Sequence, residues 1–362
     1  MPEIKINPYE GVDWDAVEQK RVNLHTHTTD SDGDWDPEDV VDLYADAGYY
    51  GLAITEHETD GSPSPVDPYP NWPWSEFDRD PGEMGIVAIK GNESDGGGEG
   101  HHVLSLFNGV GVTDDDPETA DRVVKIRDNG GLAIIAHPYS KDCCGDTHLF
   151  DDATGTLFDT LQEFDDDDIP PIEIYNQGKR DLFEQDRDPT SKDMWFDVMD
   201  YYAPDHILIG YANDDAHEYD DPTDFENSWN TLLIEDPPDP SDDQEGARQA
   251  IRDALEEGRF YISNDHNAES AGAPIINSID VDEVQKTITV DAEDHDGIHW
   301  LTSGREEIAT GSKLEYGEHE SLSNSFVIPV LEGSETATQP FTFEGDGPVA
   351  EIGDAQLGDV TF

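Results

Sequence analysis

The stretch that decides the fold is Val22-Asn23-Leu24-His25-Thr26-His27, followed by Thr28-Thr29-Asp30-Ser31-Asp32-Gly33. Apolar and polar residues alternate into the two histidines, as in a strand with one buried face. Because strand side chains alternate between faces, His25 and His27 point the same way and can bind one cation. A His-x-His pair also occurs by chance or on a solvated strand face, so its interpretation as a metal site depends on the rest of the chain.

The same pattern, an apolar strand with a candidate metal ligand at its end, recurs further along the chain. Six predicted apolar strands end in or near His, Glu or Asp: residues 22–27, 49–55, 85–90, 132–136, 171–175 and 206–210. A further strand at 103–107 opens with His101-His102. Helices are predicted between them, at 37–47, 117–129 and around 194–199, and another helix at 241–257 with Ser241 as its cap precedes a strand at 259–263.

This order indicates an α/β fold in which outer helices connect the strands of a closed barrel. In such a barrel the carboxyl ends of the strands converge on one face, where functional sites are built. We expect residues 1–267 to form this domain. From about residue 268 no convincing helix is predicted, and short strands at 275–279, 287–292, 326–330 and 341–343 predict a small all-β, sandwich-like domain over 268–362.

Composition limits the function classes. The chain of 362 residues has 86 acidic and 19 basic residues, which give a formal net charge of −67. Such a surface repels phosphate backbones and anionic lipid, so it disfavours a stable nucleic-acid complex or membrane binding. The apolar runs between the acids are intact, which predicts a folded protein from a salt-adapted organism whose self-repulsion is screened by concentrated salt.

The remaining composition signals predict a cytoplasmic protein. No apolar run approaches the roughly 20 residues that span a bilayer, and the N-terminus lacks a basic-then-apolar signal. The two cysteines, Cys143 and Cys144, are adjacent and cannot form an ordinary long-range disulfide, which fits a reducing compartment. We interpret them as two free thiols on a loop rather than as a soft-metal site with His148.

The candidate ligands are the imidazoles and carboxylates near the strand ends. They are His25, His27, Asp32, His57, Glu93, His102, His137, Asp215 and His217. Mixed nitrogen and oxygen ligands suit zinc, manganese or iron better than calcium or magnesium alone. Nine ligands exceed the needs of one ion. Two or three ions about 3.5–4 Å apart would share a carboxylate and hold a bridging hydroxide, an arrangement used for phosphoester hydrolysis.

These motifs resemble those of the PHP (polymerase and histidinol phosphatase) domain. The resemblance rests on their order and spacing over residues 5–265. They are His25-Thr-His-Thr-Thr-Asp-Ser-Asp-Gly, Ile54-Thr-Glu-His57, Gly91-Asn-Glu93, His102-Val-Leu, Ala136-His-Pro, Ile172-Glu-Ile-Tyr-Asn176 and Asp215-Ala-His217. The resemblance implies a distorted (β/α)7 TIM-like barrel and a trinuclear site that hydrolyses phosphoesters.

The resemblance also implies how the ligands are shared. His25 and His27 would bind one ion with Glu93 and Asp215, and Glu93 would bridge to a second ion on His102 and His137. A third ion would lie on Asp32, His57 and His217. The chain departs from the family pattern at Glu56, where Asp is usual and an extra methylene could displace a contact to a ligand. The doubled His101-His102 leaves an ambiguity of one residue, and we choose His102 because it directly precedes the strand.

The substrate is less well specified. Asn176, Lys179 and Arg180 are candidate substrate contacts because cations are rare in this chain, although the Lys-Arg pair could equally neutralise nearby acids. We expect a metal-dependent phosphoesterase acting on a small phosphate monoester or a nucleotide-like compound. The alternatives are a metal-retaining binding or regulatory module and an amidohydrolase-type enzyme on the same metals. A polymerase-associated role is disfavoured because no polymerase portion is present, and no oligomeric state is predicted.

Overall fold

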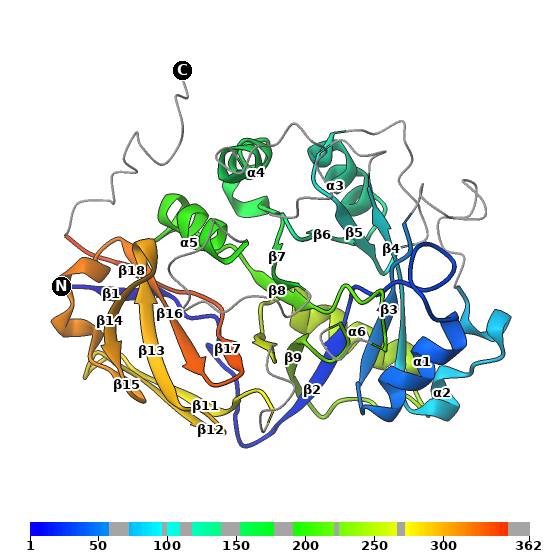
Figure 1. The fold of residues 1–362 in the computed structure, drawn as a ribbon. Helices are drawn as coiled ribbons and strands as arrows, with labels where there is room; N and C mark the ends of the chain where they lie inside the picture. Colours follow the sequence, from blue (N-terminus) through cyan, green and yellow to red (C-terminus); the bar gives the residue numbers. More distant parts are fainter. Residues whose placement is uncertain are drawn as a thin grey trace.

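The computed structural model of the chain describes residues 1–57, 72–95, 100–108, 118–138, 153–176, 191–220, 224–265 and 272–346 (Figure 1). It is a mixed α/β fold with one large sheet and a smaller three-stranded sheet. The strands before the tail are β1 (Glu3–Ile6), β2 (Val17–Asn23), β3 (Gly51–Ile54), β4 (Val87–Ser94), β5 (Val103–Leu106), β6 (Leu132–Ile135), β7 (Ile172–Asn176), β8 (Gly210–Asn213), β9 (Ser228–Glu235) and β10 (Phe260–Asn264).

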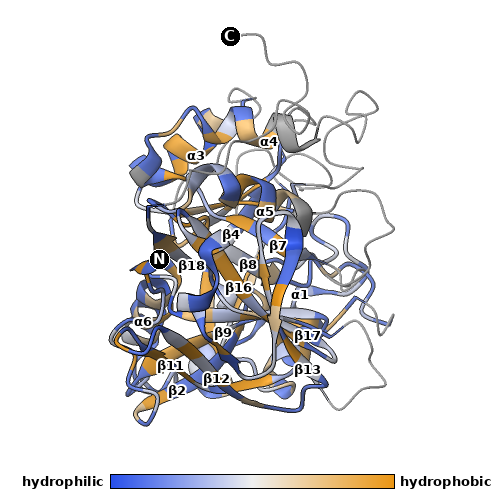
Figure 2. Cartoon of the chain, turned by 90° about the vertical axis from the view of Figure 1, so that its left-hand side faces the viewer, coloured by the Kyte–Doolittle hydropathy of each residue, from blue (hydrophilic) through white to orange (hydrophobic). Residues whose placement is uncertain are grey.

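Most of the helices pack against the strands of this large sheet. They are α1 (Pro37–Asp46), α2 (Pro81–Met84), α3 (Thr119–Asp128), α4 (Ala153–Leu161), α5 (Ser191–Tyr202) and α6 (Gln244–Glu256). Helix α1 contacts β3, α3 contacts β5 and β6, α5 contacts β7, and α6 contacts β4 and β9, while α4 contacts the helices α3 and α5. Figure 2 shows hydrophobic residues concentrated along the strands, which supply much of the buried core. Among the described residues, no helix has the length and apolar character needed to cross a membrane.

The central strands follow the order β2-β3-β4-β5-β6-β7-β8. The pairs β2–β3, β3–β4, β6–β7 and β7–β8 are parallel, whereas β5 runs antiparallel to both of its neighbours. His102 precedes β5, so the reversed direction brings the amino end of this strand to the edge where the other strands have their carboxyl ends. A sheet of parallel strands alone, as the barrel prediction assumed, therefore does not describe this region.

The ends of this path, β2 and β8, meet just beyond the strands themselves. A single parallel bridge joins Thr26 to Ala216. The backbone N–H of His27 donates to Ala216 O over 3.0 Å, and the N–H of Asp215 donates to His25 O over 2.9 Å. These contacts place the residues that follow the first and the last central strand side by side.

The tail adds strands to both sheets. It contains β11 (Ile275–Asp282), β12 (Thr287–Glu293), β13 (Gly297–Thr302), β14 (Glu306–Thr310), β15 (Lys313–Leu314), β16 (Ser325–Glu332), β17 (Glu335–Ala337) and β18 (Phe341–Glu344). Strands β11, β12 and β15 form the small sheet, while β17 pairs with β10 and β18 pairs with β1. Pairing thus crosses the predicted division between residues 267 and 268, and the division itself stays a prediction.

Several predicted boundaries differ in the structure, and the strand expected at 85–90 extends as β4 to Ser94 and so contains Glu93. The strand expected at 22–27 runs instead as β2 over Val17–Asn23, so the two histidines follow it. The strand expected at 206–210 begins only at Gly210, where paired residues start on β7. Helix α6 is capped by Asp243, whose carboxylate accepts from the N–H of Gly246 over 2.9 Å, rather than by Ser241. Strand β9, which pairs with both β2 and β10, was not predicted.

Candidate metal centre

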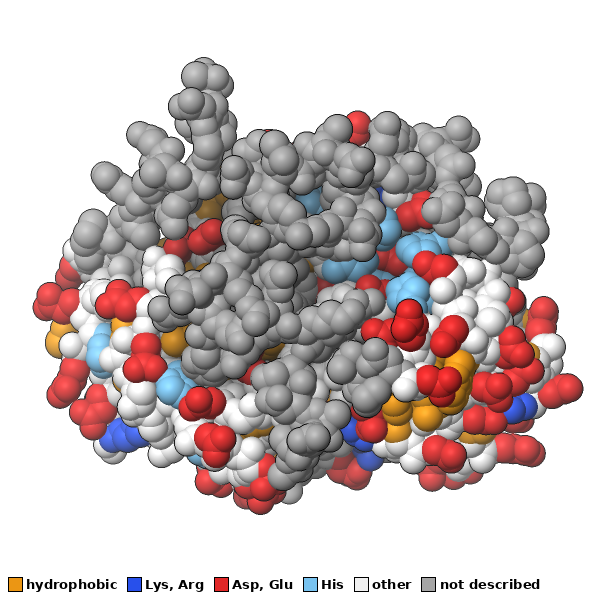
Figure 3. Space-filling model, viewed as in Figure 1, with side chains coloured by type: hydrophobic (Ala, Val, Ile, Leu, Met, Phe, Trp, Pro, Cys, Tyr) orange, Lys and Arg blue, Asp and Glu red, His pale blue; other side chains and the backbone are white. Residues whose placement is uncertain are grey.

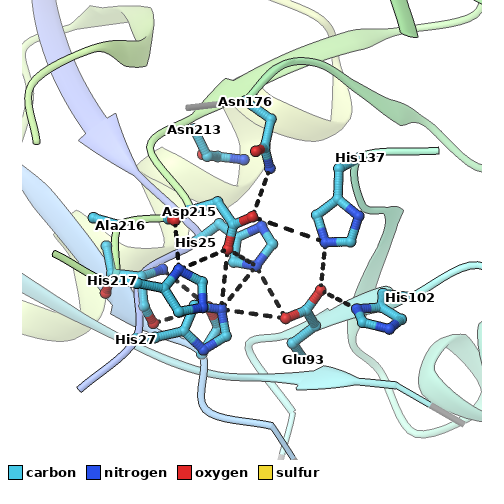
Figure 4. Close-up of polar contacts among 12 residues, drawn as sticks. His25, His27, Glu93, His102, His137, Asn176, Asn213, Asp215, Ala216 and His217 are labelled. Atoms are coloured by element: carbon cyan, nitrogen blue, oxygen red, sulfur yellow. Dashed lines mark hydrogen bonds and ion pairs between the residues drawn. The ribbon is translucent and has the colours of Figure 1, made fainter. Parts of the chain in front are cut away.

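All nine candidate ligands lie together at one edge of the central strands, and Figure 4 labels all of them except Asp32 and His57. His25 and His27 follow β2, His57 follows β3, and Glu93 lies within β4. His102 precedes β5, His137 follows β6, Asp215 and His217 follow β8, and Asp32 lies in the segment before α1. Figure 3 shows several of the histidines gathered among carboxylates at one place on the surface.

Glu93 lies at the centre of the cluster, and its two oxygens face different histidines. Its side chain is almost fully buried. Oε2 lies 3.2 Å from Nε2 of both His25 and His27. Oε1 lies 2.8 Å from Nδ1 of His102 and 2.8 Å from Nε2 of His137. Glu93 is therefore placed as a carboxylate shared between two sets of ligands.

Glu93 Oε2 and three neighbouring atoms, His25 Nε2, His27 Nε2 and Asp215 Oδ1, lie close enough together to bind one small cation. Asp215 Oδ1 lies 3.1 Å from Nε2 of His25 and of His27, and these two nitrogens are 3.2 Å apart. Together with the two contacts of Glu93, five of the six distances within the set are 3.1–3.2 Å. Separations of this size are close to those between neighbouring ligand atoms of one zinc ion, whose bonds to nitrogen and oxygen are about 2.0–2.2 Å long.

A third group of ligand atoms surrounds Asp32. Its Oδ1 lies 3.3 Å from Nε2 of His217, and its Oδ2 lies 3.6 Å from Nε2 of His57. His27 Nδ1 lies 3.5 Å from Asp32 Oδ1, so the ring of His27 contacts both this group and the set around Glu93 Oε2. His57 likewise has its Nδ1 3.3 Å from Glu93 Oε2.

Grouping by mutual proximity alone differs from the grouping that the family resemblance implies. Ligand atoms within 4.8 Å of one another place His137 with His25, Glu93 and Asp215, and place His57 with Glu93 and His102. We assign His137 by its closer contact, because its Nε2 is 2.8 Å from Glu93 Oε1 but 4.0 Å from Asp215 Oδ2. The shorter distance pairs His137 with His102 on the same oxygen.

The charges of the cluster are mutually stabilised. Burial opposes ionisation of Glu93, but the adjacent His25, His102 and His57 outweigh it and hold the pKa of this carboxyl well below its usual range. Burial also acts to lower the pKa of His57, yet Glu93 and Asp32 raise it to about 10. In the metal-free protein, protons on His25, His57, His137 and His217, whose pKa values are raised, take the electrostatic role that cations would take, whereas burial lowers the pKa of His102.

Two of the ligands are held by unusual backbone. His137 has φ +24° and Asp215 has φ +49°, a region that residues other than glycine seldom adopt. Such conformations cost about 1–3 kcal/mol each and persist only where the surroundings enforce them. The N–H of Asp215 donates to His25 O, and the N–H of His137 donates to Glu173 Oε2 over 2.9 Å. The fold thus fixes the backbone of these residues directly at the cluster.

The adjacent residues His101 and His102 occupy different places in the structure, and it is His102 that contacts Glu93. His102 points its Nδ1 at Glu93, whereas His101 is buried beside Thr119 and Arg122, with its backbone N–H donating to Thr119 Oγ1 over 2.9 Å. Of the candidate substrate contacts, Asn176 donates from Nδ2 to Asp215 Oδ2 over 3.1 Å and to Glu173 Oε2 over 2.8 Å. Lys179 and Arg180 lie outside the described residues, as do Cys143, Cys144 and His148.

The chain's departure at Glu56 has a visible consequence. The buried Glu56 carboxylate accepts hydrogen bonds from the hydroxyls of Thr28 and Ser31. Ser31 Oγ in turn lies 3.3 Å from Nδ1 of His27. The longer side chain therefore contacts the ligand through Ser31.

Sequence reasoning assigned no role to two residues beneath the cluster. Glu173 is fully buried on β7 with its Oε1 3.2 Å from Nδ1 of His25, and Asn213 donates to the same oxygen over 2.8 Å. Glu173 belongs to the motif Ile172-Glu-Ile-Tyr-Asn176, which is one of those that resemble the PHP domain. Its place in this motif is the sequence feature that could have indicated a role at the site.

Comparison with known proteins supports the fold. The sequence matches no family model and no curated protein. A two-domain protein from Bacteroides vulgatus ATCC 8482, containing a predicted PHP-like metal-dependent phosphoesterase, matches with a TM-score of 0.50 at 14% identity over 94% of this chain and 90% of that one.

Two other solved structures match less well. A candidate metal-dependent phosphoesterase from Bifidobacterium adolescentis ATCC 15703 has a TM-score of 0.38 at 14% identity, covering 66% of this chain and 96% of that one. An amidohydrolase from Chromobacterium violaceum, with bound sulfate and no metal, has a TM-score of 0.35 at 17% identity, covering 55% and 88%. At sequence identities of 14–17%, a structural match is evidence about the fold and not about the activity. The chain is thus similar in fold, over nearly its whole length, to the two-domain protein of Bacteroides vulgatus.

Proposed function

We propose that this protein is a PHP-like metal-dependent phosphoesterase with a TIM-like barrel, and that it hydrolyses a small phosphate monoester or nucleotide-like compound. The observation that carries the proposal is the position of Glu93, whose two oxygens face two separate sets of ligand atoms. A carboxylate shared in this way is what a site for adjacent divalent ions requires.

The proposed ligands follow the distances. His25, His27, Glu93 and Asp215 would hold one ion, and Glu93 with His102 and His137 a second. Asp32, His57 and His217 would hold a third. Zinc, manganese or iron suits this mixed donor set. When bound, divalent ions would supply Lewis-acid stabilisation of phosphoryl oxygens and lower the pKa of water toward neutrality.

Charge favours a phosphate ester over a neutral amide at this site. The chain as a whole is strongly acidic and repels anions. Three carboxylates, Asp32, Glu93 and Asp215, lie in the cluster. Three divalent cations would outweigh these carboxylates and that of Glu173 beneath them, and the positive local charge would attract a phosphate dianion. Lys179 or Arg180 would then orient the far end of the anion.

The residues around the proposed ions keep the site away from water and hold the ligands in fixed directions. His25, His27 and Glu93 are buried, so water competes little for these ligands and electrostatic interactions among them are strong. The two strained backbones at His137 and Asp215 fix the direction of their side chains before any ion arrives. Asn176 donates a hydrogen bond to Oδ2 of Asp215, while Oδ1 of the same carboxylate faces His25 and His27.

The test combines metal analysis with a panel of phosphoesters. Protein purified in concentrated salt should carry two or three transition-metal ions and hydrolyse at least one of p-nitrophenyl phosphate, sugar phosphates, nucleoside monophosphates or a phosphodiester. His25→Ala with His27→Ala should lose metal and turnover together, whereas His319→Ala, in the tail, should keep both. A wild-type protein fully loaded with manganese or zinc that hydrolyses none of the panel would point to a binding module instead.

A further inference from the structure

Glu173 gathers four hydrogen bonds in the layer directly beneath the ligands. Its Oε1 accepts from Asn213 Nδ2 over 2.8 Å and lies 3.2 Å from His25 Nδ1. Its Oε2 accepts from the backbone N–H of His137 over 2.9 Å and from Asn176 Nδ2 over 2.8 Å. The side chain is fully buried. One carboxylate thus contacts residues that follow or end four different strands.

Three of these partners can act only as donors. The N–H of His137 is main chain. Asn213 is fixed in orientation, because its Oδ1 accepts from the N–H of Leu24 over 2.9 Å and from Asn230 Nδ2 over 3.1 Å. Asn176 is fixed as well, because its Nδ2 also donates to the carboxylate of Asp215. Both oxygens of Glu173 are therefore acceptors. A donor group in place of either oxygen would face the N–H of another donor.

This arrangement determines which nitrogen of His25 carries a proton. Since Oε1 is an acceptor, it takes the proton of Nδ1, so Nε2, which faces Glu93 and Asp215, is the nitrogen that would give up its proton and offer its lone pair to an ion. The same carboxylate holds the strained backbone of His137 through its N–H, and it contacts Asp215 through Asn176.

We propose that Glu173 is the positioning residue of the metal centre, which selects the Nδ1–H form of His25 and orients His137 and Asp215 without binding metal itself. This inference rests on the proposed function for the identity of the ligands. Outer partners of this kind typically change metal affinity about 10–100-fold when they are replaced.

A matched pair of substitutions tests the proposal. Glu173→Gln introduces an amide NH2 that must face fixed donors, either Asn213 and His25 or His137 and Asn176. Glu335→Gln changes a buried carboxylate in the same way, but its partners include the hydroxyl of Tyr175, which can donate or accept. We expect Glu173→Gln to weaken zinc binding about 10–100-fold and Glu335→Gln to weaken it less than about threefold.

The readouts are independent of catalysis. Zinc affinity is measured by competition with a chromophoric chelator, and 15N spectra of histidine-labelled, zinc-loaded protein report the Nδ1–H of His25, assigned with His25→Ala. The wild type should show this proton and Glu173→Gln should lose or shift it. Unchanged zinc affinity together with an unchanged His25 signal in Glu173→Gln would overturn the proposal.

Two further outcomes are also decisive. If Glu173→Gln does not fold, Asn176→Ala removes only the connection between Glu173 and Asp215, and it should weaken zinc binding while leaving the His25 signal in place. Unchanged affinity in that variant overturns the proposal. A wild type that binds zinc yet hydrolyses no phosphoester refutes the proposed function and leaves the role of Glu173 intact, whereas a wild type that binds no zinc refutes both.

Discussion

The side chain of Gln339 forms two hydrogen bonds with the backbone of Gly210. The N–H of Gly210 donates to Oε1 over 2.9 Å, and Nε2 donates to the carbonyl of Gly210 over 2.8 Å. Asn230 makes the same pair with Ala212, two residues further along β8. Two buried side-chain amides therefore satisfy an edge of β8 with which none of the described strands pairs, and one of them comes from the tail.

Gln339→Leu should loosen the strand that leads to Asp215 and His217. The substitution leaves the buried N–H and C=O of Gly210 without their partner, which should lower the free energy of unfolding by about 2–4 kcal/mol and weaken zinc binding. Urea denaturation and chelator competition measure the two effects. Thr342→Val is the control, since it removes one buried hydrogen bond from β18, to Pro204 O, and leaves both amide pairs of β8 in place. Equal zinc affinity in both variants would contradict a role of the tail in the site.

Glu93→Gln and Asp32→Asn should differ in how many ions they lose. Glu93 contacts two sets of ligands through two oxygens, whereas Asp32 belongs to the third group, with His57 and His217, and is assigned to one ion. We therefore expect Glu93→Gln to lose about two ions per chain and Asp32→Asn about one. Inductively coupled plasma mass spectrometry after desalting gives the counts. Asp205→Asn, a carboxylate paired with Lys5 far from the cluster, should keep every ion.

The stability of the metal-free protein should fall as pH rises. Burial lowers the pKa of His57 and of His217, but the surrounding carboxylates outweigh it and raise the values from 6.5 to about 10 and about 9. The folded state thus binds these protons more tightly than the unfolded state. The resulting stabilisation is fully present below pH 6.5 and is lost as pH rises through 9 to 10. Urea denaturation in excess chelator should show this decline.

Metal binding should depend on pH in the opposite direction. Ions must displace the protons of His57 and His217, so zinc affinity should increase from pH 6.5 upward and binding should release protons. Calorimetry in buffers of different ionisation enthalpy counts the released protons. A metal-free protein with level stability across this range, together with binding that releases no protons, would contradict the assigned charge state.

Removing salt should destabilise the protein. Its 86 acidic residues outnumber 19 basic ones, and Figure 3 shows carboxylates spread over the visible surface. At low ionic strength their repulsion acts over a longer distance. We expect Tm to rise by about 5–10 °C between 0.1 M and 2 M KCl, a change of about 2 kcal/mol or more for a chain of this size. If sucrose of equal osmolarity gives the same rise, screening is not the cause.

Much of the fold follows from local patterns that the sequence displays. Helix α1 begins at Pro37 and is followed by Gly48 at φ +79°, as proline and glycine at these positions predict. Strands β3, β4, β6 and β7 overlap the predicted apolar runs, and their ends bring the candidate ligands to one edge. The boundary errors at β2 and β8 arose because a strand is defined by its partners, which local hydrophobicity does not specify.

The sequence by itself determined the ligand types, their place near strand ends and the strongly negative surface, because side-chain alternation and composition are properties of neighbouring residues. Tertiary structure alone decided that β5 runs antiparallel, that Glu93 faces two sets of histidines, and that Glu173 lies beneath them. Asn213 and Glu173 are 40 residues apart and make a 2.8 Å hydrogen bond. No periodicity along the chain encodes such a contact, since it exists only after distant strands have been packed together.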